Sequence, residues 1–189
     1  GYLTDDATID VTINPINDAP IVEQIIEQQS LEDSIFTYLV NATDVDLDVL
    51  TYDVIPNQNA TLWFSDNEIN ISPNNNWNGV LNIQFSVFDG IFTTYQDFTL
   101  NVIPVNDPPV SVDINGSGDE AATITATLTA TDVDNTDENT FTFTILTQPA
   151  HMTGSVSIGT VSYSGGTFTA DATYIHDDTQ NYSDDFTYR

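Results

Sequence analysis

Alternation of apolar and polar residues runs through much of the chain and predicts β-strands. Six segments alternate, or nearly alternate, aliphatic or aromatic residues with threonine, asparagine or aspartate. A period of two in segments rich in β-branched and aromatic residues is typical of strands with one buried face. The six segments are residues 7–13, 81–88, 98–103, 122–130, 140–146 and 170–175. No stretch of the sequence shows the 3.6-residue spacing of an amphipathic helix.

Turn-forming residues separate these segments. Asn78-Gly79, Asp89-Gly90 and Gly165-Gly166 are pairs that favour tight turns. Several short strands with regular turns, in units of under about 100 residues, favour a β-sandwich. We therefore predict an all-β protein.

One octet occurs twice and marks an internal repeat. "INPINDAP" ends at Pro20 and "VIPVNDPP" ends at Pro109, so the two copies lie 89 residues apart. A second pair, "ATDVDLD" from Ala42 and "ATDVDNTD" from Ala130, lies 88 residues apart. A fixed period of domain size predicts an array of similar units.

The octets also indicate the domain boundaries. Their prolines are incompatible with a paired central strand, so each octet is predicted to be a short, stiff linker. We predict a complete domain over residues 19–105 and a second domain, lacking its final strand, over residues 106–189. Residues 1–18 are expected to be the last strand and linker of a preceding repeat, so the chain is expected to be a piece of a longer protein.

The charge balance narrows the candidate partners. The chain has 29 Asp and Glu against one Lys or Arg, a formal net charge of −28. Phosphate binding needs basic residues, so nucleic acid is excluded as a partner and an anionic membrane surface is disfavoured. No apolar run reaches the length of about 18 residues that membrane insertion needs. The acidic residues form either a solvated surface or carboxylate clusters that bind metal cations.

Five short motifs follow one another after the first octet, and the last of them is part of the second octet. They are "LEDS" from Leu31, "ATDVD" from Ala42, "NWNG" from Asn76, "FDG" from Phe88 and "VNDPP" from Val105. Their order resembles the cadherin-type repeat, most nearly the bacterial cadherin-like version found in long arrays in surface and secreted proteins. The resemblance implies tandem Greek-key β-sandwiches of the cadherin and immunoglobulin type, arranged end to end, in an extracellular or cell-surface bacterial protein.

The second predicted domain departs from this pattern. It has "ATDVD" from Ala130 but continues to "YIHDDTQNYSDDFTY" from Tyr174. That stretch resembles the repeats of chondroitin sulfate proteoglycans, a cadherin relative, with Asp178 where that family has glycine. The Leu-Asp-Arg-Glu motif of animal cadherins is absent from the sequence.

The resemblance implies Ca²⁺ at the junctions between consecutive domains. Two carboxylates about 4 Å apart repel by roughly 4 kcal/mol at an effective dielectric of about 20, and Ca²⁺ takes six to eight oxygen ligands. The alternative is an Asx-rich loop that only caps turns. The expected ligands are Asn17, Asp18, Asp44, Asp46 and Asp89 at the first junction, and Glu32, Asp33, Asn106, Asp107, Asp132 and Asp134 at the second. Asp48 and Asp137 extend these acidic runs, either as ligands or as solvated surface.

Two functions are compatible with these features. The first is a structural and adhesive segment of an extracellular multi-repeat protein, rigidified by calcium, with neighbouring repeats and a cell-surface glycan or protein as partners. The second is a carbohydrate-binding module, suggested by Trp63, Trp77 and eight tyrosines. Trp77 is expected instead to pack at the edge of the sandwich. His151 and His176 are the only histidines and form no recognisable catalytic motif, so we do not expect an enzyme.

The N-terminal segment carries one further expectation. Residues 7–14 match the strand predicted to close each repeat, and the second domain is expected to lack that strand. We expect the segment of one copy to complete the second domain of another, head to tail, by strand donation. Such a contact builds filaments or rings.

Overall fold

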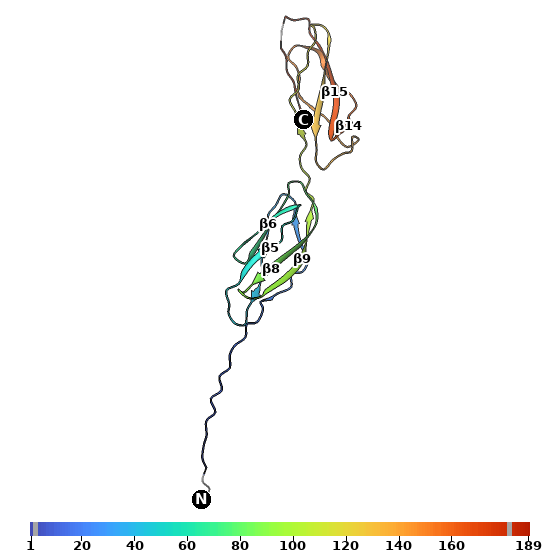
Figure 1. The fold of residues 1–189 in the computed structure, drawn as a ribbon. Helices are drawn as coiled ribbons and strands as arrows, with labels where there is room; N and C mark the ends of the chain where they lie inside the picture. The colour runs from blue at the N-terminus through green and yellow to red at the C-terminus, as the bar shows by residue number, and fades with distance from the viewer. Residues whose placement is uncertain (2–3, 181–182) are drawn as a thin grey trace. The chain divides into compact units, whose positions relative to one another are not determined.

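The computed structural model describes residue 1, residues 4–180 and residues 183–189, and none of these residues is helical. The chain divides into two compact units, Gly1–Val105 (unit 1) and Asn106–Arg189 (unit 2). Both are built from β-strands (Figure 1). The prediction of an all-β fold is confirmed.

Unit 1 is a sandwich of two main sheets. The first has the strand order β2-β9-β8-β5 and the second the order β3-β7-β6, while β1 and β4 form a separate pair. Strand β2 runs parallel to β9, and the other pairs are antiparallel. The strands are β1 Ile21–Val22, β2 Gln28–Leu31, β3 Phe36–Leu39, β4 Ala42–Thr43, β5 Thr51–Val54, β6 Ala60–Ser65, β7 Glu68–Pro73, β8 Gly79–Phe88 and β9 Thr93–Ile103.

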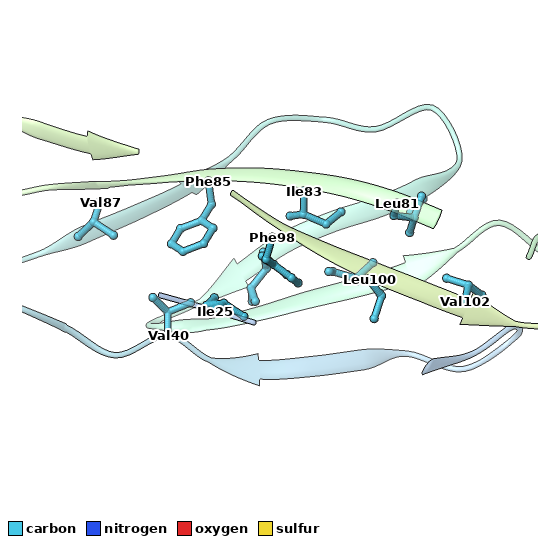
Figure 2. Close-up of a cluster of buried hydrophobic side chains, with 12 residues drawn as sticks. Ile25, Val40, Leu81, Ile83, Phe85, Val87, Phe98, Leu100 and Val102 are labelled. Atoms are coloured by element: carbon cyan, nitrogen blue, oxygen red, sulfur yellow. The ribbon is translucent and has the colours of Figure 1, made fainter. Parts of the chain in front are cut away.

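The core of unit 1 follows directly from the alternation in its sequence. Alternate residues over Leu81–Val87 of β8 and Phe98–Val102 of β9 are at most 5% exposed and gather in one cluster between the strands (Figure 2). Burying one aliphatic or aromatic side chain contributes about 1.5–3 kcal/mol, so this face is the main source of stability. The inward residues are Leu81, Ile83, Phe85 and Val87 of β8, and Phe98, Leu100 and Val102 of β9.

Unit 2 has one large sheet and one small one. The large sheet has the order β10-β11-β15-β13, with β14 also paired to β15, and the small sheet is the pair β12-β16. Its core includes Phe141 stacked on Phe168, with ring centroids 3.9 Å apart. The strands are β10 Val110–Ser111, β11 Thr123–Thr131, β12 Ile145–Thr147, β13 Met152–Ile158, β14 Ser162–Ser164, β15 Thr167–His176 and β16 Thr187–Tyr188.

Four of the six predicted strands are confirmed in β8, β9, β11 and β15, and two predictions need correction. Residues 7–13 form no strand, because no described strand pairs with their backbone N–H and C=O groups. Of residues 140–146, only the last two belong to a strand. The partner strand β16 spans two residues, so the backbone before Thr144 has no strand alongside it.

Candidate metal centre

Six polar residues gather at one end of unit 1, where they form what we call the first acidic cluster: Asn17, Asp18, Asp44, Asp46, Asp48 and Asp89. Strand pairing brings them together. Because β1 and β4 are antiparallel, with Ile21 opposite Thr43, the residues before β1 meet the residues after β4. The amide N of Asp18 accordingly donates to Asp46 Oδ2 at 2.8 Å.

Asp89 completes the cluster from the end of β8. Its Oδ2 accepts from Asn17 Nδ2 at 3.0 Å, and its Oδ1 accepts from the amides of Ile91 and Phe92, each at 2.6 Å. Burial raises the pKa of Asp89, but these amides and Asn17 together lower it more, so the pKa lies below its usual 3.8. Asp89 is therefore anionic at neutral pH although only 7% exposed.

Asp44 is the most unusual member. It is 9% exposed, its Oδ1 accepts from the amide of Asp46 at 2.8 Å, and its buried Oδ2 has no hydrogen-bond partner. Carboxylate oxygens of Asp44, Asp46 and Asp48 lie within 4.8 Å of one another. A buried anionic oxygen without a donor is costly unless a cation satisfies it.

A strained turn produces this convergence. Alternate residues of a straight strand lie about 6.6 Å apart along its axis. On such a strand, Asp44, Asp46 and Asp48 would therefore lie too far apart to share one cation. Here Leu47 adopts a φ of 63°, which is rare for a bulky residue, and its amide contacts the Asp44 carbonyl at 3.4 Å. The turn folds the aspartates back toward one another, and strain of this kind is typical of functional loops.

Unit 2 repeats this arrangement at its own first strand pair, in a second acidic cluster of Asn106, Asp107, Asp132 and Asp134. Val110 lies opposite Thr131, as Ile21 lies opposite Thr43. The amide of Asp107 donates to Asp134 Oδ2 at 2.5 Å, and the amide of Asp134 donates to Asp132 Oδ1 at 2.9 Å. The same local bonds thus recur in both units.

The second acidic cluster differs in its surroundings. Among the described residues, no carboxylate accepts a hydrogen bond from Asn106 in the way that Asp89 accepts one from Asn17. Arg189, the sole basic residue, instead lines a hollow of about 310 Å³ together with Asp132.

Among the described residues, no hydrogen bond links Asp137 to a member of the second acidic cluster. Its Oδ1 accepts from the backbone and side-chain nitrogens of Asn139 at 3.0 and 2.9 Å, and both bonds lower its pKa.

Glu32 and Asp33 lie apart from the first acidic cluster. Glu32 is 2% exposed, and its two carboxylate oxygens accept from the amide of Val105 at 2.7 Å and from Asn78 Nδ2 at 3.2 Å. Asp33 Oδ1 accepts from the amide of Asn76 at 2.9 Å. Within unit 1, the two acids therefore tie the "NWNG" turn and the segment after β9 to the end of β2.

The first acidic cluster fits a calcium ion. Its donors are carboxylate and amide oxygens, which are the ligands that Ca²⁺ prefers, and its irregular loops suit a cation that tolerates irregular geometry. The structure brings together all five residues that the sequence predicted for this site and adds Asp48, whose role the sequence left open. The spacing of Asp44, Asp46 and Asp48 was the signal for that sixth residue.

The remaining candidate residues are placed elsewhere. Trp77 packs against the core of unit 1 and against Gly79, where a Cβ would lie 3.2 Å from its ring, whereas Trp63 is 39% exposed. His176 is 6% exposed and its Nδ1 has no hydrogen-bond partner. His151 Nδ1 lies 3.9 Å from Asp177 Oδ2.

Comparison with solved structures gives distant likenesses. An endo-fucoidan hydrolase of glycoside hydrolase family 107, in its H294Q form, aligns with a TM-score of 0.42 and 16% identity, over 89% of this chain, which spans only 26% of that protein. Human protocadherin-24 EC1-2 aligns with a TM-score of 0.47 and 13% identity, over 91% of this chain and 85% of that one. Titin domains Z1Z2 in complex with telethonin align with a TM-score of 0.36 and 13% identity, over 92% and 95%. These scores are too low to carry an argument.

Neither a curated relative nor, in the described part of the chain, a membrane-spanning helix was found. No curated protein matches the chain. Within the described residues, no helix has the length and apolar character of a membrane span.

The family comparison is specific to one segment. The model of the cadherin-like domain matches residues 16–103, which include all of the first acidic cluster as well as Glu32 and Asp33. The match ends before unit 2, so the resemblance of that unit to chondroitin sulfate proteoglycan repeats stays a prediction. Cadherin-like domains are generally extracellular and have adhesive or structural roles. Residues 16–103 are a member of the cadherin-like domain family.

Proposed function

We propose that the chain is a structural and adhesive segment of an extracellular multi-repeat protein, in which calcium bound at the junctions between repeats stiffens the array. The supporting observation is the first acidic cluster, where a buried Asp44 oxygen without a donor lies among carboxylates within 4.8 Å of one another. The recurrence of the same bonds in unit 2 supports a junction at each linker.

The linker residues explain why the ion would act on rigidity. Asn17 and Asp18 precede β1, and their bonds to Asp89 and Asp46 already draw the linker onto unit 1. A cation shared by these carboxylates would remove their mutual repulsion and hold the linker in one conformation. Extracellular calcium modules bind with dissociation constants of about 10⁻⁴–10⁻³ M, so millimolar calcium would be sufficient.

Calorimetry and scattering test this proposal. Titration of the chain with calcium at neutral pH is expected to show binding, and calcium is expected to raise the melting temperature because it binds the native state. Small-angle scattering is expected to give a longer, straighter particle in calcium than in chelator. An absence of calcium binding, or identical scattering curves in both conditions, would contradict the proposal. Magnesium is the matched control, since it requires stricter octahedral geometry.

A carbohydrate-binding module is the second candidate function. It is favoured by exposed aromatic side chains on the β8–β9 hairpin, where Phe88, Phe92 and Tyr95 are 40%, 47% and 62% exposed. Aromatic faces of this kind stack on sugar rings. A glycan array is expected to distinguish the two functions, because binding that is lost in a Y95A variant but kept in chelator would favour the carbohydrate module.

A further inference from the structure

The imidazole and thioether groups of the chain meet at one place in unit 2. The sequence contains two histidines, one methionine and no cysteine. His151 and Met152 are consecutive, and Met152 pairs with His176 where β13 lies beside β15. The rings of His151 and His176 have centroids 6.4 Å apart. The three side chains of the kind that soft and borderline transition metals prefer are therefore neighbours.

His176 is the buried member of this group. It is 6% exposed, and although its backbone N donates to the carbonyl of Ala122 at 3.3 Å, its Nδ1 has no hydrogen-bond partner among the described residues. Nδ1 is a donor in one neutral tautomer and an acceptor in the other, so burying it without a partner costs free energy in either state. An ion that accepts the lone pair of Nδ1 would remove this cost.

His151 is held in place through its backbone at the start of β13. The two carboxylate oxygens of Asp184 accept from the amides of Ala150 and His151 at 2.9 and 2.8 Å. The carbonyl of His151 accepts from the amide of Asp177 at 3.2 Å. The side chain of His151 is 37% exposed, so it can rotate toward His176 and meet an ion that enters from solvent. A fixed backbone with an accessible ring is a suitable support for a metal ligand.

The donor atoms decide which ion fits. Imidazole nitrogen suits zinc, copper and nickel, whereas a thioether sulfur selects copper in its reduced form, Cu⁺. Calcium prefers oxygen ligands, so this group and the two acidic clusters would take different ions. We propose that His151, Met152 and His176 bind one Cu⁺ ion in unit 2, with Nδ1 of His176 as one of the ligands. The site is independent of the proposed calcium function.

The spacing of the side chains is compatible with one shared ion. For nitrogen–metal bonds of about 2.0 Å, two imidazole ring centres on one ion lie about 5 Å apart in a tetrahedral site and about 6.3 Å apart in a linear one. The observed 6.4 Å thus requires closure by about 1 Å or less, which rotation of His151 supplies. Residues opposite each other on antiparallel strands have Cβ atoms about 4.5–5.5 Å apart, so the flexible side chain of Met152 reaches the ring of His176.

Competition with a chromophoric Cu⁺ chelator tests the site, in oxygen-free buffer with a reductant and millimolar calcium. The full chain, without a histidine tag, is expected to bind one Cu⁺ ion. Carboxylates are poor ligands for this soft ion, so the 29 acidic residues are not expected to compete. His151→Gln and Met152→Leu are each expected to weaken binding at least tenfold, and the exposed D178N control is expected to change it less than about twofold.

Both test variants keep the fold at low risk, since His151 is partly exposed and the change of methionine to leucine conserves volume. An absence of Cu⁺ binding, or an affinity that neither variant weakens, would overturn the proposal. Zinc is the comparison ion. An affinity for zinc equal to or above that for Cu⁺ would overturn the choice of copper.

Nitrogen NMR tests the role of His176 without replacing this buried residue. The chain has two histidines, so the four ring nitrogens can be assigned individually. Cu⁺ is diamagnetic, and its binding is expected to shift Nδ1 of His176 and one ring nitrogen of His151. The indole nitrogens of Trp63 and Trp77, both in unit 1, serve as the control and are expected to stay in place. Shifts confined to His151 would overturn the proposal and indicate that water satisfies Nδ1 of His176.

Melting experiments separate this site from the calcium sites. In saturating calcium, Cu⁺ is expected to raise the melting temperature of unit 2, followed by circular dichroism, because it binds the native state. The tryptophan fluorescence transition, which reports on unit 1, is expected to stay unchanged. The same rise in the H151Q variant as in the unsubstituted chain would contradict the proposed ligands.

Discussion

The two units share their polar clusters and differ in the sheet that closes the sandwich. In unit 1 the closing sheet has the order β2-β9-β8-β5, and β9 spans Thr93–Ile103. In unit 2 the corresponding sheet is the short pair β12-β16. Nevertheless, both units hold their aspartates with the same hydrogen bonds.

The comparison shows that the acidic clusters and the hydrophobic core depend on contacts of different range in the sequence. An acidic cluster depends on one short antiparallel pair, β1 with β4 or β10 with β11, so it forms in either unit. A hydrophobic core depends on strands that need not follow one another in the chain, as where β5 pairs with β8 and β2 with β9 in unit 1. The acidic clusters are thus locally encoded, whereas the core requires pairing between distant strands.

The largest expected effect is a difference in thermal stability between the units. Among the described residues, the core of unit 1 buries more large apolar side chains than that of unit 2. Each such side chain is worth about 1.5–3 kcal/mol, and 1 kcal/mol shifts the melting temperature of a small domain by about 4–8 °C. Unit 2 is therefore expected to unfold at least about 10 °C below unit 1. Both tryptophans lie in unit 1, so their fluorescence follows that unit alone, while circular dichroism follows both. Coincident transitions at micromolar concentration would contradict this difference.

The next largest effect is expected from shortening one buried side chain of β9. Leu100→Ala is expected to destabilise unit 1 by about 2–5 kcal/mol, because Leu100 is fully buried. Val11, its counterpart in the N-terminal segment, is 75% exposed, so Val11→Ala is expected to change the free energy of unfolding by less than about 0.5 kcal/mol. Urea unfolding followed by tryptophan fluorescence measures both. Similar losses in the two variants would mean that the N-terminal segment is packed in solution.

Calcium affinity distinguishes the two acidic clusters. Asp44→Asn is expected to weaken binding at the first acidic cluster at least tenfold, about 1.4 kcal/mol, and to leave the second unchanged. Asp132→Asn is expected to do the reverse, because each cluster has its own ligands. Calorimetric titration measures both, with D53N on the exposed face of β5 as control. Unfolding of D44N in saturating calcium would instead assign Asp44 a structural role.

Acid sensitivity probes unit 2 separately. Burial raises the pKa of Asp184, but the amides of His151, Ala150 and Asp185 lower it more, so its pKa lies below the usual 3.8. A lowered folded-state pKa means that Asp184 stabilises unit 2 above its unfolded pKa and that this contribution is lost as the pH falls through the folded value. Between pH 6 and pH 3, the melting temperature of D184N is expected to fall less than that of the unsubstituted chain.

The control for this acid series is D178N, since Asp178 is exposed. Equal acid sensitivity of D184N and the unsubstituted chain, measured by circular dichroism, would show that Asp184 is not the titrating group.

The smallest expected effect concerns the strained turn in the first acidic cluster. Asparagine tolerates a positive φ better than leucine, and Leu47 is 88% exposed. Leu47→Asn is therefore expected to stabilise unit 1 by up to about 1 kcal/mol without changing calcium affinity. Leu47→Val, which is β-branched, is expected to destabilise it. Urea unfolding compares the two, and a destabilised L47N would mean that the turn carries no relievable strain.

The sequence by itself determined the period-two strands, the all-β fold and most of the first acidic cluster. Alternation such as that of Leu81, Ile83, Phe85 and Val87 can be read locally, because side chains on a strand alternate between its faces. The repeated octets and the pair Asp44 and Asp46 could also be recognised locally. The candidate metal ligands lie on short segments beside strand ends, so their spacing in the sequence indicated a metal site.

Only the tertiary structure decided which of these local features are paired and buried. Residues 7–13 and residues 98–103 have the same pattern, yet only the second segment has neighbours on both sides and becomes part of a strand. Likewise, the turn at Leu47 that gathers Asp44, Asp46 and Asp48 depends on a backbone conformation that its sequence disfavours. Strand pairing and strained turns arise from contacts between residues distant in sequence, so local periodicity does not determine them.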